Sequence, residues 1–307
     1  MTSLDDNFSF GEPPKHLGRA RLPRKEYVAL VMSLAVLVGA LLIWRVASGS
    51  EVTSSDVPAP EGAGAAGPGP VNSNGATDVT EAGQLPRSLA KLLDMGLPVY
   101  CGAGTKPMVA LTFDDGPGAY TSYTIDTLRN YNAKATFFLV GKLLGNKTSD
   151  QTARVEARFG DVGNHAWSHF GLAGEPRSVL DREVRRTKKA LEEATGEPVI
   201  YFRPPWGSRD KSLDDYVREL GMIEMMWTFD TYDSRGANTD KIVKTVLNNA
   251  RPGAIILLHE NRGTTKNALD GILSGLAEKG LQPVTLTTML TLDPPNRNQL
   301  KKGLQGC

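Results

Sequence analysis

This chain of 307 residues has no excess of either charge, because its 35 basic and 34 acidic side chains leave a formal net charge of +1. Because neither sign dominates, the composition gives no reason to expect nucleic acid or another polyanion as a partner. Histidine and cysteine are also scarce, with four and two copies, and there is no internal repeat. The few histidines and cysteines can therefore be considered one by one.

Long apolar runs are absent except near the N-terminus, where Tyr27 to Trp44 is long enough to cross a bilayer as a helix. Four basic residues between positions 19 and 25 precede it, and positive residues stay on the cytoplasmic side. We therefore expect a cytoplasmic segment (1–26), a transmembrane signal anchor (27–44) in the cell membrane, and an outward-facing remainder. A signal peptide cleaved near Val46 to Ser48 is the alternative, and it also exports the remainder.

The segment after the apolar run has too few large apolar side chains to form a core. Residues 45–84 are rich in Gly, Pro and Ala, so a disordered linker is predicted there. Residues 85–307 then form one folded domain, which we expect to be monomeric. Its two cysteines, Cys101 and Cys307, lie near its ends, and they are either a disulfide or two free thiols, since the sequence does not reveal their separation.

In the folded region, short apolar runs alternate with amphipathic stretches, which is typical of parallel strands joined by helices. The expected strands are Met108 to Phe113, Ala135 to Val140, Val199 to Phe202, Ile223 to Trp227 and Ala254 to His259. The expected helices are one opened by a capping pair of Ser178 and Asp181 and closed by Gly196, and those at Ser212 to Leu220, Thr239 to Ala250 and Asn267 to Glu278. The pattern predicts an α/β barrel or open sheet, with its chemistry at the C-terminal ends of the strands.

Carboxylates and imidazoles occur at those strand ends. The first strand runs into Asp114 and Asp115, although Asp-Gly-Pro is also ordinary turn sequence. His165 and His169 are four residues apart, a spacing that puts two imidazoles on one face of a helical turn and suits a metal such as zinc. The pattern indicates a metal site with an adjacent carboxylate base.

These residues resemble the polysaccharide deacetylase family, the NodB-type enzymes of carbohydrate esterase family 4, over about Val109 to Met289. The matching motifs are Thr112 to Pro117, Gly163 to His169, Arg203 to Gly207 and Leu257 to His259. A further motif, Asp-x-x-Asp-Trp, is met only in part by Asp230 to Ser234, where serine replaces tryptophan. The resemblance implies that 85–307 is the catalytic domain, with the fold of a distorted, incomplete (β/α) barrel of about seven parallel strands.

The resemblance also implies a role for each motif residue in removing acetyl groups from amino sugars of an extracellular polysaccharide. The metal ligands would be Asp115, His165 and His169, and the metal Zn²⁺, with Co²⁺, Ni²⁺ or Mn²⁺ also compatible. Asp114 would be the base, oriented by Arg203, and His259 the acid, kept charged by Asp233 or Asp230. The implied substrate contacts are Trp206, Tyr232, Leu257, Trp167 and Pro205. The three aromatic residues among them are equally compatible with a core role.

Three alternatives remain open on the sequence. The domain could be an esterase of O-acetylated xylan, or a catalytically weak carbohydrate-binding protein that keeps the fold. Two histidines with a carboxylate also suit Fe(II) in an oxygenase, although the adjacent Asp114 and the expected export argue against that chemistry. The anchor and linker favour the cell's own wall, as peptidoglycan or a chitin-like polymer.

Overall fold

The computed structural model describes residues 85–307. The predicted cytoplasmic segment, anchor and linker (1–84) lie outside the described residues. Within 85–307, no helix combines the length and apolar character that a bilayer crossing requires. The described part begins with helix α2 (Arg87–Met95), which leads into the first strand of the sheet.

The sheet is parallel throughout, and its strands follow the order β5-β4-β3-β2-β1-β7-β6. Their bounds are β1 (Met108–Gly116), β2 (Ala135–Leu139), β3 (Asp161–Asn164), β4 (Tyr201–Phe202), β5 (Ile223–Glu224), β6 (Phe229–Asp230) and β7 (Ile255–His259). A short strand off this path, β8 (Gln282–Pro283), pairs with the start of β1. Because the path ends at β5 and β6 without joining them, the sheet is an incomplete barrel of seven parallel strands, as predicted.

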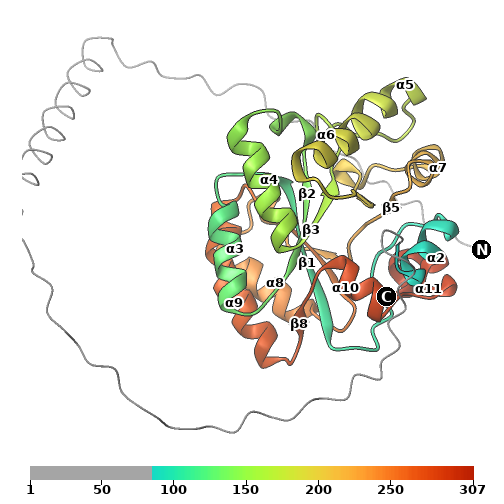
Figure 1. The fold of residues 1–307 in the computed structure, drawn as a ribbon. Helices are drawn as coiled ribbons and strands as arrows, with labels where there is room; N and C mark the ends of the chain where they lie inside the picture. The colour runs from blue at the N-terminus through green and yellow to red at the C-terminus, as the bar shows by residue number, and fades with distance from the viewer. Residues whose placement is uncertain (1–84) are drawn as a thin grey trace, which may run out of the picture. The chain divides into compact units, whose positions relative to one another are not determined.

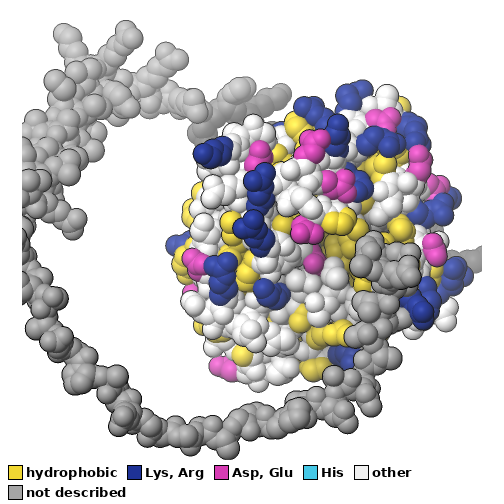
Figure 2. Space-filling model, in the orientation of Figure 1, with side chains coloured by type: hydrophobic (Ala, Val, Ile, Leu, Met, Phe, Trp, Pro, Cys, Tyr) yellow, Lys and Arg dark blue, Asp and Glu magenta, His cyan; other side chains and the backbone are white. Residues whose placement is uncertain are grey.

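The remaining helices lie between the strands, except for the last two, which follow β8. They are α3 (Thr121–Asn130), α4 (Lys147–Phe159), α5 (Arg177–Leu180), α6 (Arg186–Thr195), α7 (Lys211–Glu219), α8 (Thr239–Asn249), α9 (Gly263–Glu278), α10 (Leu286–Leu292) and α11 (Arg297–Lys302). Helix α9 packs against both α3 and α8 on one side of the sheet (Figure 1). On the face drawn in Figure 2, acidic and basic side chains lie interspersed, in keeping with the small net charge.

Three strands were absent from the sequence prediction, and two were predicted too long. β3 contains only one large apolar residue, Val162, while β6 and β8 have two residues each, so periodicity could not reveal them. The strands expected to start at Val199 and to end at Trp227 shorten to β4 and β5. The central strands β1, β2 and β7 were predicted correctly within a few residues.

The predicted helix caps were partly wrong. The helix begins at Arg177 after Pro176 with no side-chain cap, and Asp181 instead accepts hydrogen bonds from Arg185 and Tyr216. A π-helical segment, η2 (Asp181–Arg185), joins α5 to α6. The helix does end at Gly196, whose φ of 77° is the left-handed conformation that glycine adopts easily. The other predicted helices correspond to α7, α8 and α9.

Strand alternation decides which side chains of β1 reach the functional end of the barrel. Leu111 and Phe113 pack into the cluster between the sheet and its outer helices, whereas Ala110 belongs to a second cluster with Phe138 and Ile255. Because side chains alternate along a strand, Thr112 and Asp114 project on the same side as Ala110. The inner face of β1 therefore changes from apolar to polar toward its C-terminal end.

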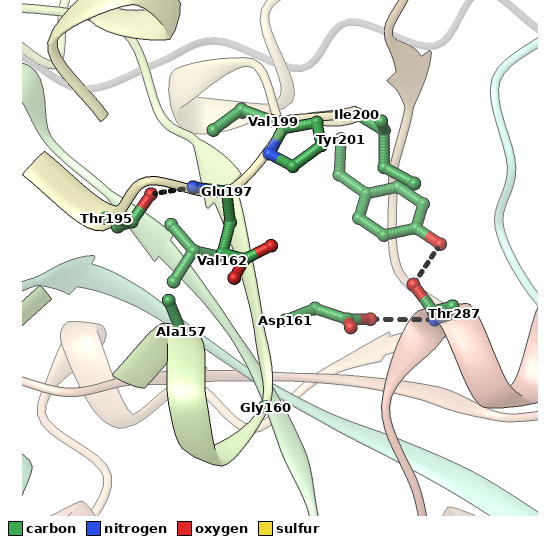
Figure 3. Close-up of a pocket in the computed structure, with 11 residues that line it drawn as sticks. Ala157, Gly160, Asp161, Val162, Thr195, Glu197, Val199, Ile200, Tyr201 and Thr287 are labelled. Carbon is green, nitrogen blue, oxygen red and sulfur yellow. Dashed lines mark hydrogen bonds between the residues drawn. The ribbon is translucent and has the colours of Figure 1, made fainter. Parts of the chain in front are cut away.

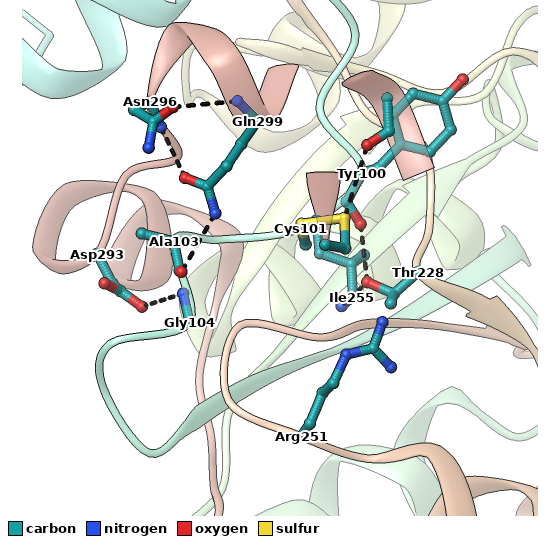
Figure 4. Close-up of a disulfide and its surroundings, with 12 residues drawn as sticks. Tyr100, Cys101, Ala103, Gly104, Thr228, Arg251, Ile255, Asp293, Asn296 and Gln299 are labelled. Carbon is teal, nitrogen blue, oxygen red and sulfur yellow. Dashed lines mark hydrogen bonds between the residues drawn. A yellow bond between two sulfur atoms is a disulfide. The ribbon is translucent and has the colours of Figure 1, made fainter. Parts of the chain in front are cut away.

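The two cysteines form a disulfide, which decides between the alternatives that the sequence left open. Cys101 and Cys307 are 206 positions apart, and their Cα atoms are 5.9 Å apart. Neighbouring contacts fasten the same two chain segments, because the Asp293 carboxylate accepts hydrogen bonds from the backbone N–H groups of Gly104 and Thr105 (Figure 4). The disulfide thus ties the start of the domain to the helices at its end.

We expect the disulfide to contribute on the order of 2–5 kcal/mol to the free energy of unfolding, because it closes a long loop in the unfolded chain. Reduction with dithiothreitol should therefore lower the Tm of the wild-type protein by roughly 5–15 °C. The double variant Cys101→Ser/Cys307→Ser should match the reduced protein and not respond to dithiothreitol. Equal melting temperatures for all three samples would contradict this expectation.

A pair of buried carboxyl groups lies under the loop that follows β1. Glu156 of α4 is 0% exposed and Glu260, after β7, is 2% exposed. A Cβ atom at Gly116, the last residue of β1, would come within 1.9 Å of Glu260 Oε2, so a side chain there would displace the buried carboxyl group. Burial, reinforced by the charge of Glu260, raises the pKa of Glu156 well above its usual value, and burial raises the pKa of Glu260 to about 7.

The carboxyl pair predicts a stability that falls with rising pH. The folded state retains protons that the unfolded state releases. The contribution of these carboxyl groups to the free energy of unfolding is therefore complete below about pH 4.5 and is lost as the pH rises through about 7. The difference in Tm between Glu156→Gln and wild type should therefore be a few degrees more positive at pH 8.5 than at pH 5. Glu193→Gln, an exposed glutamate on α6, is the matched control. A Glu156→Gln effect that did not depend on pH would refute the assignment.

Candidate active site

The two adjacent carboxylates at the end of β1 face one site, which a regular strand would not allow. Asp115 has a φ of 70°, and the pairing of β1 with β2 shifts register between Asp114 and Gly116. This irregularity turns Asp115 toward the side that Asp114 already occupies. As a result, Nε2 of His165 lies 3.6 Å from Asp114 Oδ2 and 3.8 Å from Asp115 Oδ1.

The two histidines converge, but not on a helical turn as the sequence predicted. The segment after β3 is a loop in which Ala166 and His169 both have a φ of 61°. The two imidazole rings are nevertheless 4.9 Å apart between centroids. Nδ1 of His165 lies 2.8 Å from the carbonyl oxygen of Arg203, which directs Nε2 toward the carboxylates. The predicted helical turn carrying the two histidines was therefore wrong. The closeness of the two rings agrees with the prediction that both imidazoles lie at one site.

Asp115, His165 and His169 have the arrangement of a metal site. One potential ligand atom from each residue lies within 4.8 Å of the others. Asp115 Oδ1 lies 3.1 Å from His169 Nε2, and His165 Nε2 is buried without a hydrogen bond within the described residues, a costly state that a shared cation would relieve. Burial, followed by the neighbouring His165, lowers the pKa of His169, which favours the neutral imidazole that binds metals. The residues present therefore fit a divalent cation.

Asp114 is held from behind by Arg203, which is fully buried. Nη1 of Arg203 donates to Asp114 Oδ1 at 2.8 Å and to Thr112 Oγ1 at 2.7 Å. The expected orientation of Asp114 by Arg203 is present, through one hydrogen bond and not two. The other donors reach the carbonyl oxygens of Met225 and Met226, so the guanidinium also links β1 to the segment after β5. Asp114 Oδ2 remains directed into the site.

His259, at the end of β7, lines the same pocket and is paired with Asp233. Its Nδ1 is 2.7 Å from Asp233 Oδ1, and its backbone N–H donates to Asp233 Oδ2. Burial opposes the charged imidazole, but the hydrogen bond with Asp233 and the nearby Asp114 outweigh it and raise the pKa of His259. Asp230 instead accepts from the backbone N–H of Tyr232, so Asp233 is the partner of His259.

The predicted substrate-contacting residues do not all reach the pocket. Trp206 and Leu257 line it, and the Trp206 indole is 75% exposed with its centroid 4.8 Å from that of His169. Tyr232 is 46% exposed beside the pocket, so a core role for it is wrong. Trp167 lies under the Arg186 guanidinium, 3.4 Å from its ring centroid, and Pro205 is buried while Pro204 lines the pocket.

Several residues at the site were absent from the sequence prediction. The Glu183 carboxylate accepts hydrogen bonds from the backbone N–H and the hydroxyl of Ser168, at 2.8 and 2.9 Å, and so fastens the loop directly before His169. Thr265 donates to Asp233 Oδ2 at 2.5 Å. Both residues lie on helices outside the motifs, where an ordinary Glu or Thr carries no signal in one sequence. Two arginines, Arg235 and Arg262, also line the pocket.

A second hollow lies at the opposite end of the sheet, around the start of β3 (Figure 3). Its polar groups have structural partners. Asp161 Oδ2 accepts from the backbone N–H of Thr287 at 2.7 Å, and the Tyr201 hydroxyl is 2.9 Å from Thr287 Oγ1. These contacts attach α10 to the sheet, and the hollow contains none of the predicted site residues.

Comparisons with known proteins agree with this site. Residues 102–225 match the family model for polysaccharide deacetylase. A peptidoglycan-N-acetylglucosamine deacetylase of Bacillus cereus is 34% identical over 195 residues, which are 62% of this chain and 70% of that protein. The crystal structure of the Bc1960 peptidoglycan N-acetylglucosamine deacetylase aligns with a TM-score of 0.59 at 32% identity, covering 65% of this chain and 95% of that one.

A second solved structure shows that the fold alone does not guarantee catalysis. BA3943 of Bacillus anthracis, described as a pseudoenzyme of carbohydrate esterase family 4, aligns with a TM-score of 0.59 at 31% identity, covering 65% of this chain and 70% of that one. In the chain described here, each position at which the family resemblance implies a base, a metal ligand or an acid holds a residue capable of that role. With its half-barrel, its motif residues and these relatives, this chain belongs to the polysaccharide deacetylase family, carbohydrate esterase family 4.

Proposed function

We propose that this protein removes N-acetyl groups from amino-sugar residues of an extracellular polysaccharide, with peptidoglycan or a chitin-like polymer as the substrate. The observation that carries the proposal is the convergence of Asp115, His165 and His169 beside Asp114, with His259 lining the same pocket. The relatives that act on peptidoglycan support the choice of polymer. The predicted anchor would hold the enzyme at the cell membrane with its catalytic domain outside, next to that polymer.

The ligand set supports a requirement for a divalent cation. Asp115, His165 and His169 would hold it, with Zn²⁺ as our first choice and Co²⁺, Ni²⁺ or Mn²⁺ compatible with the same ligands. When bound, such a cation supplies a Lewis acid that polarises the amide carbonyl and makes water more acidic. The three side chains leave positions open for substrate and water, as catalytic metal sites do.

The remaining residues divide the two proton transfers of amide hydrolysis. Asp114 Oδ2 accepts the proton of the attacking water, while Oδ1 stays hydrogen-bonded to Arg203. His259 is kept protonated by Asp233 and gives its proton to the departing nitrogen. Water and the N-acetyl sugar thereby become acetate and a free amine. The base and the acid lie on neighbouring strands, where Asp114 of β1 pairs in register with His259 of β7, so both can reach one bound amide.

The first test is acetate release by the full-length protein. We expect release from peptidoglycan or from N-acetylglucosamine oligomers, loss of release with a chelator, and recovery when Zn²⁺ or Co²⁺ is added back. Release from acetylated xylan alone would support the esterase alternative. No release from any polymer with any of these metals would contradict the proposal and favour a carbohydrate-binding role like that of a pseudoenzyme.

Variants should separate the base from the metal ligands. Asp114→Asn should lower kcat by roughly 10²–10⁴-fold, because the amide accepts no proton, while the metal content stays near that of wild type. His169→Ala should lose the metal as well as the activity. Metal content is measured by elemental analysis after gel filtration. Asp126→Asn, an exposed carboxylate on α3, is the control. A full metal content in His169→Ala would refute the ligand assignment.

Glu183 should affect metal affinity without touching the metal. Removing its carboxylate in Glu183→Ala leaves the N–H and hydroxyl of Ser168 without their acceptor, which frees the loop carrying His169. We expect the dissociation constant for Zn²⁺, measured by competition with a fluorescent chelator, to rise by roughly 10–100-fold. Glu183→Gln, which keeps one acceptor, should fall between, and Glu193→Ala should match wild type. Equal affinities for all four proteins would remove Glu183 from this role.

A further inference from the structure

Two cationic side chains at the pocket play no part in the proposed chemistry. Arg235 ends the short helical turn after β6, η4 (Asp233–Arg235), and Arg262 directly precedes α9. Both line the pocket that contains Asp114, His165 and His259. They differ from Arg203, which is fully buried and uses its donors within the protein. The pocket therefore has two exposed guanidinium groups from separate loops.

Neither of these guanidinium groups has a close partner. Arg262 makes no side-chain hydrogen bond, ion pair or ring contact with any part of the chain from residue 85 onward. Arg235 is 69% exposed, and its Nη2 lies 3.9 Å from Asp230 Oδ2, beyond hydrogen-bond distance. Its guanidinium carbon sits 5.5 Å from the centroid of the Tyr232 ring, which holds the side chain beside the pocket. Their donors thus remain available to a ligand.

Several exposed arginines elsewhere in the domain are paired with carboxylates. Arg129, Arg177 and Arg185 each donate to a carboxylate at 2.8 Å or less. Surface pairs of that kind contribute little stability, but they do satisfy the guanidinium. Arg262 lacks such a pair although it lines a cleft with three aspartates, Asp114, Asp115 and Asp230. Other exposed arginines of the domain, such as Arg182 and Arg297, also have no acidic partner within residues 85–307, so what distinguishes Arg262 is its position at the pocket.

The residue next to Arg235 leaves space for a substituent. Ser234 lines the pocket beside Arg235, and a serine side chain takes up little of the pocket there. A guanidinium presents two parallel N–H donors that match the oxygens of a carboxylate or a phosphate. The same side of the pocket therefore combines room with anion-binding donors.

We propose that Arg262 and Arg235 form an anion subsite, so that the preferred substrate is a glycan in which the acetylated amino sugar or its neighbour carries a carboxylate or phosphate substituent. This inference rests on the proposed deacetylation and specifies its substrate class. An ether-linked substituent that ends in a carboxylate and a phosphate ester both present negatively charged oxygens to the two guanidinium groups. The net charge of +1 gave no hint of this preference, because it averages over the whole chain, whereas the two arginines act only within the pocket.

The experiment compares matched soluble glycans on the full-length protein. The substrates are an N-acetylglucosamine tetramer, a peptide-free peptidoglycan glycan with free lactyl carboxylates, the same glycan after methyl esterification, and a phosphate-substituted glycan. Acetate release gives kcat/KM for each, and calorimetry gives Kd. We expect wild type to prefer the carboxylate glycan over its ester by about tenfold or more, and this ratio to fall with added NaCl, since salt screens exposed charges.

The variants assign the preference to residues. Arg262→Gln and Arg235→Gln should each reduce the carboxylate-to-ester ratio several-fold, and Arg262→Lys should restore part of it. Arg251→Gln, an exposed arginine near the disulfide, is the control and should leave the ratio unchanged (Figure 4). Using a ratio removes effects of a variant on folding or metal content.

The outcomes distinguish this inference from the proposed function. A wild-type ratio near one, or a ratio unchanged in Arg262→Gln, would overturn the anion subsite while leaving deacetylation intact. A preference for the phosphate glycan alone would keep the subsite and identify phosphate as its ligand. If no glycan releases acetate, the proposed function fails, and the Kd values for the charged and esterified glycans still decide whether the anion subsite exists.

Discussion

A single buried guanidinium organises the candidate active site. Arg203 is fully enclosed, and it reaches Asp114 and Thr112 on β1 as well as the carbonyl oxygens of Met225 and Met226. Its own carbonyl oxygen lies 2.8 Å from Nδ1 of His165. A buried charge is tolerated only when its donors are satisfied, so this residue stabilises one arrangement of β1, the histidine loop and the end of β5. Asp114 and His165 are therefore positioned by one residue, the first through its guanidinium and the second through its carbonyl oxygen.

The pKa values of two histidines at the site are shifted in opposite directions by their surroundings. Burial lowers the pKa of His169, whereas Asp233 and Asp114 raise the pKa of His259 despite its burial. A neutral imidazole suits metal binding, and a charged one suits protonation of an amine. Both rings border one pocket, but His169 also faces the charge of the neighbouring His165, whereas His259 has the hydrogen bond with Asp233. The direct hydrogen bond between Asp233 and His259 therefore separates the metal side of the site from the acid side.

Much of the fold was predictable because its central strands are strongly apolar. β1, β2 and β7 are almost entirely buried, and such runs stand out in a sequence. β3 did not stand out, since its residues Asp161 to Asn164 owe their strand conformation to pairing with β2. The helix cap expected at Ser178 was wrong, because Asp181 accepts hydrogen bonds from Arg185, one turn along the same helical segment, and from the distant Tyr216. Local patterns thus identified elements that bury themselves, and missed those that neighbours impose.

The same division applies to function. The chemistry-bearing residues were evident in the sequence because carboxylates, imidazoles and an arginine recur in spaced motifs at strand ends, and residue type limits what each group can do. Their geometry came from contacts between distant segments. The left-handed φ of Asp115 and His169, the choice of Asp233 over Asp230 as the partner of His259, the joining of Cys101 to Cys307, and the placement of Arg235 and Arg262 at one pocket all depend on long-range packing. A sequence specifies which groups exist, whereas distances between groups far apart in the chain exist only after the sheet has brought its strand ends together.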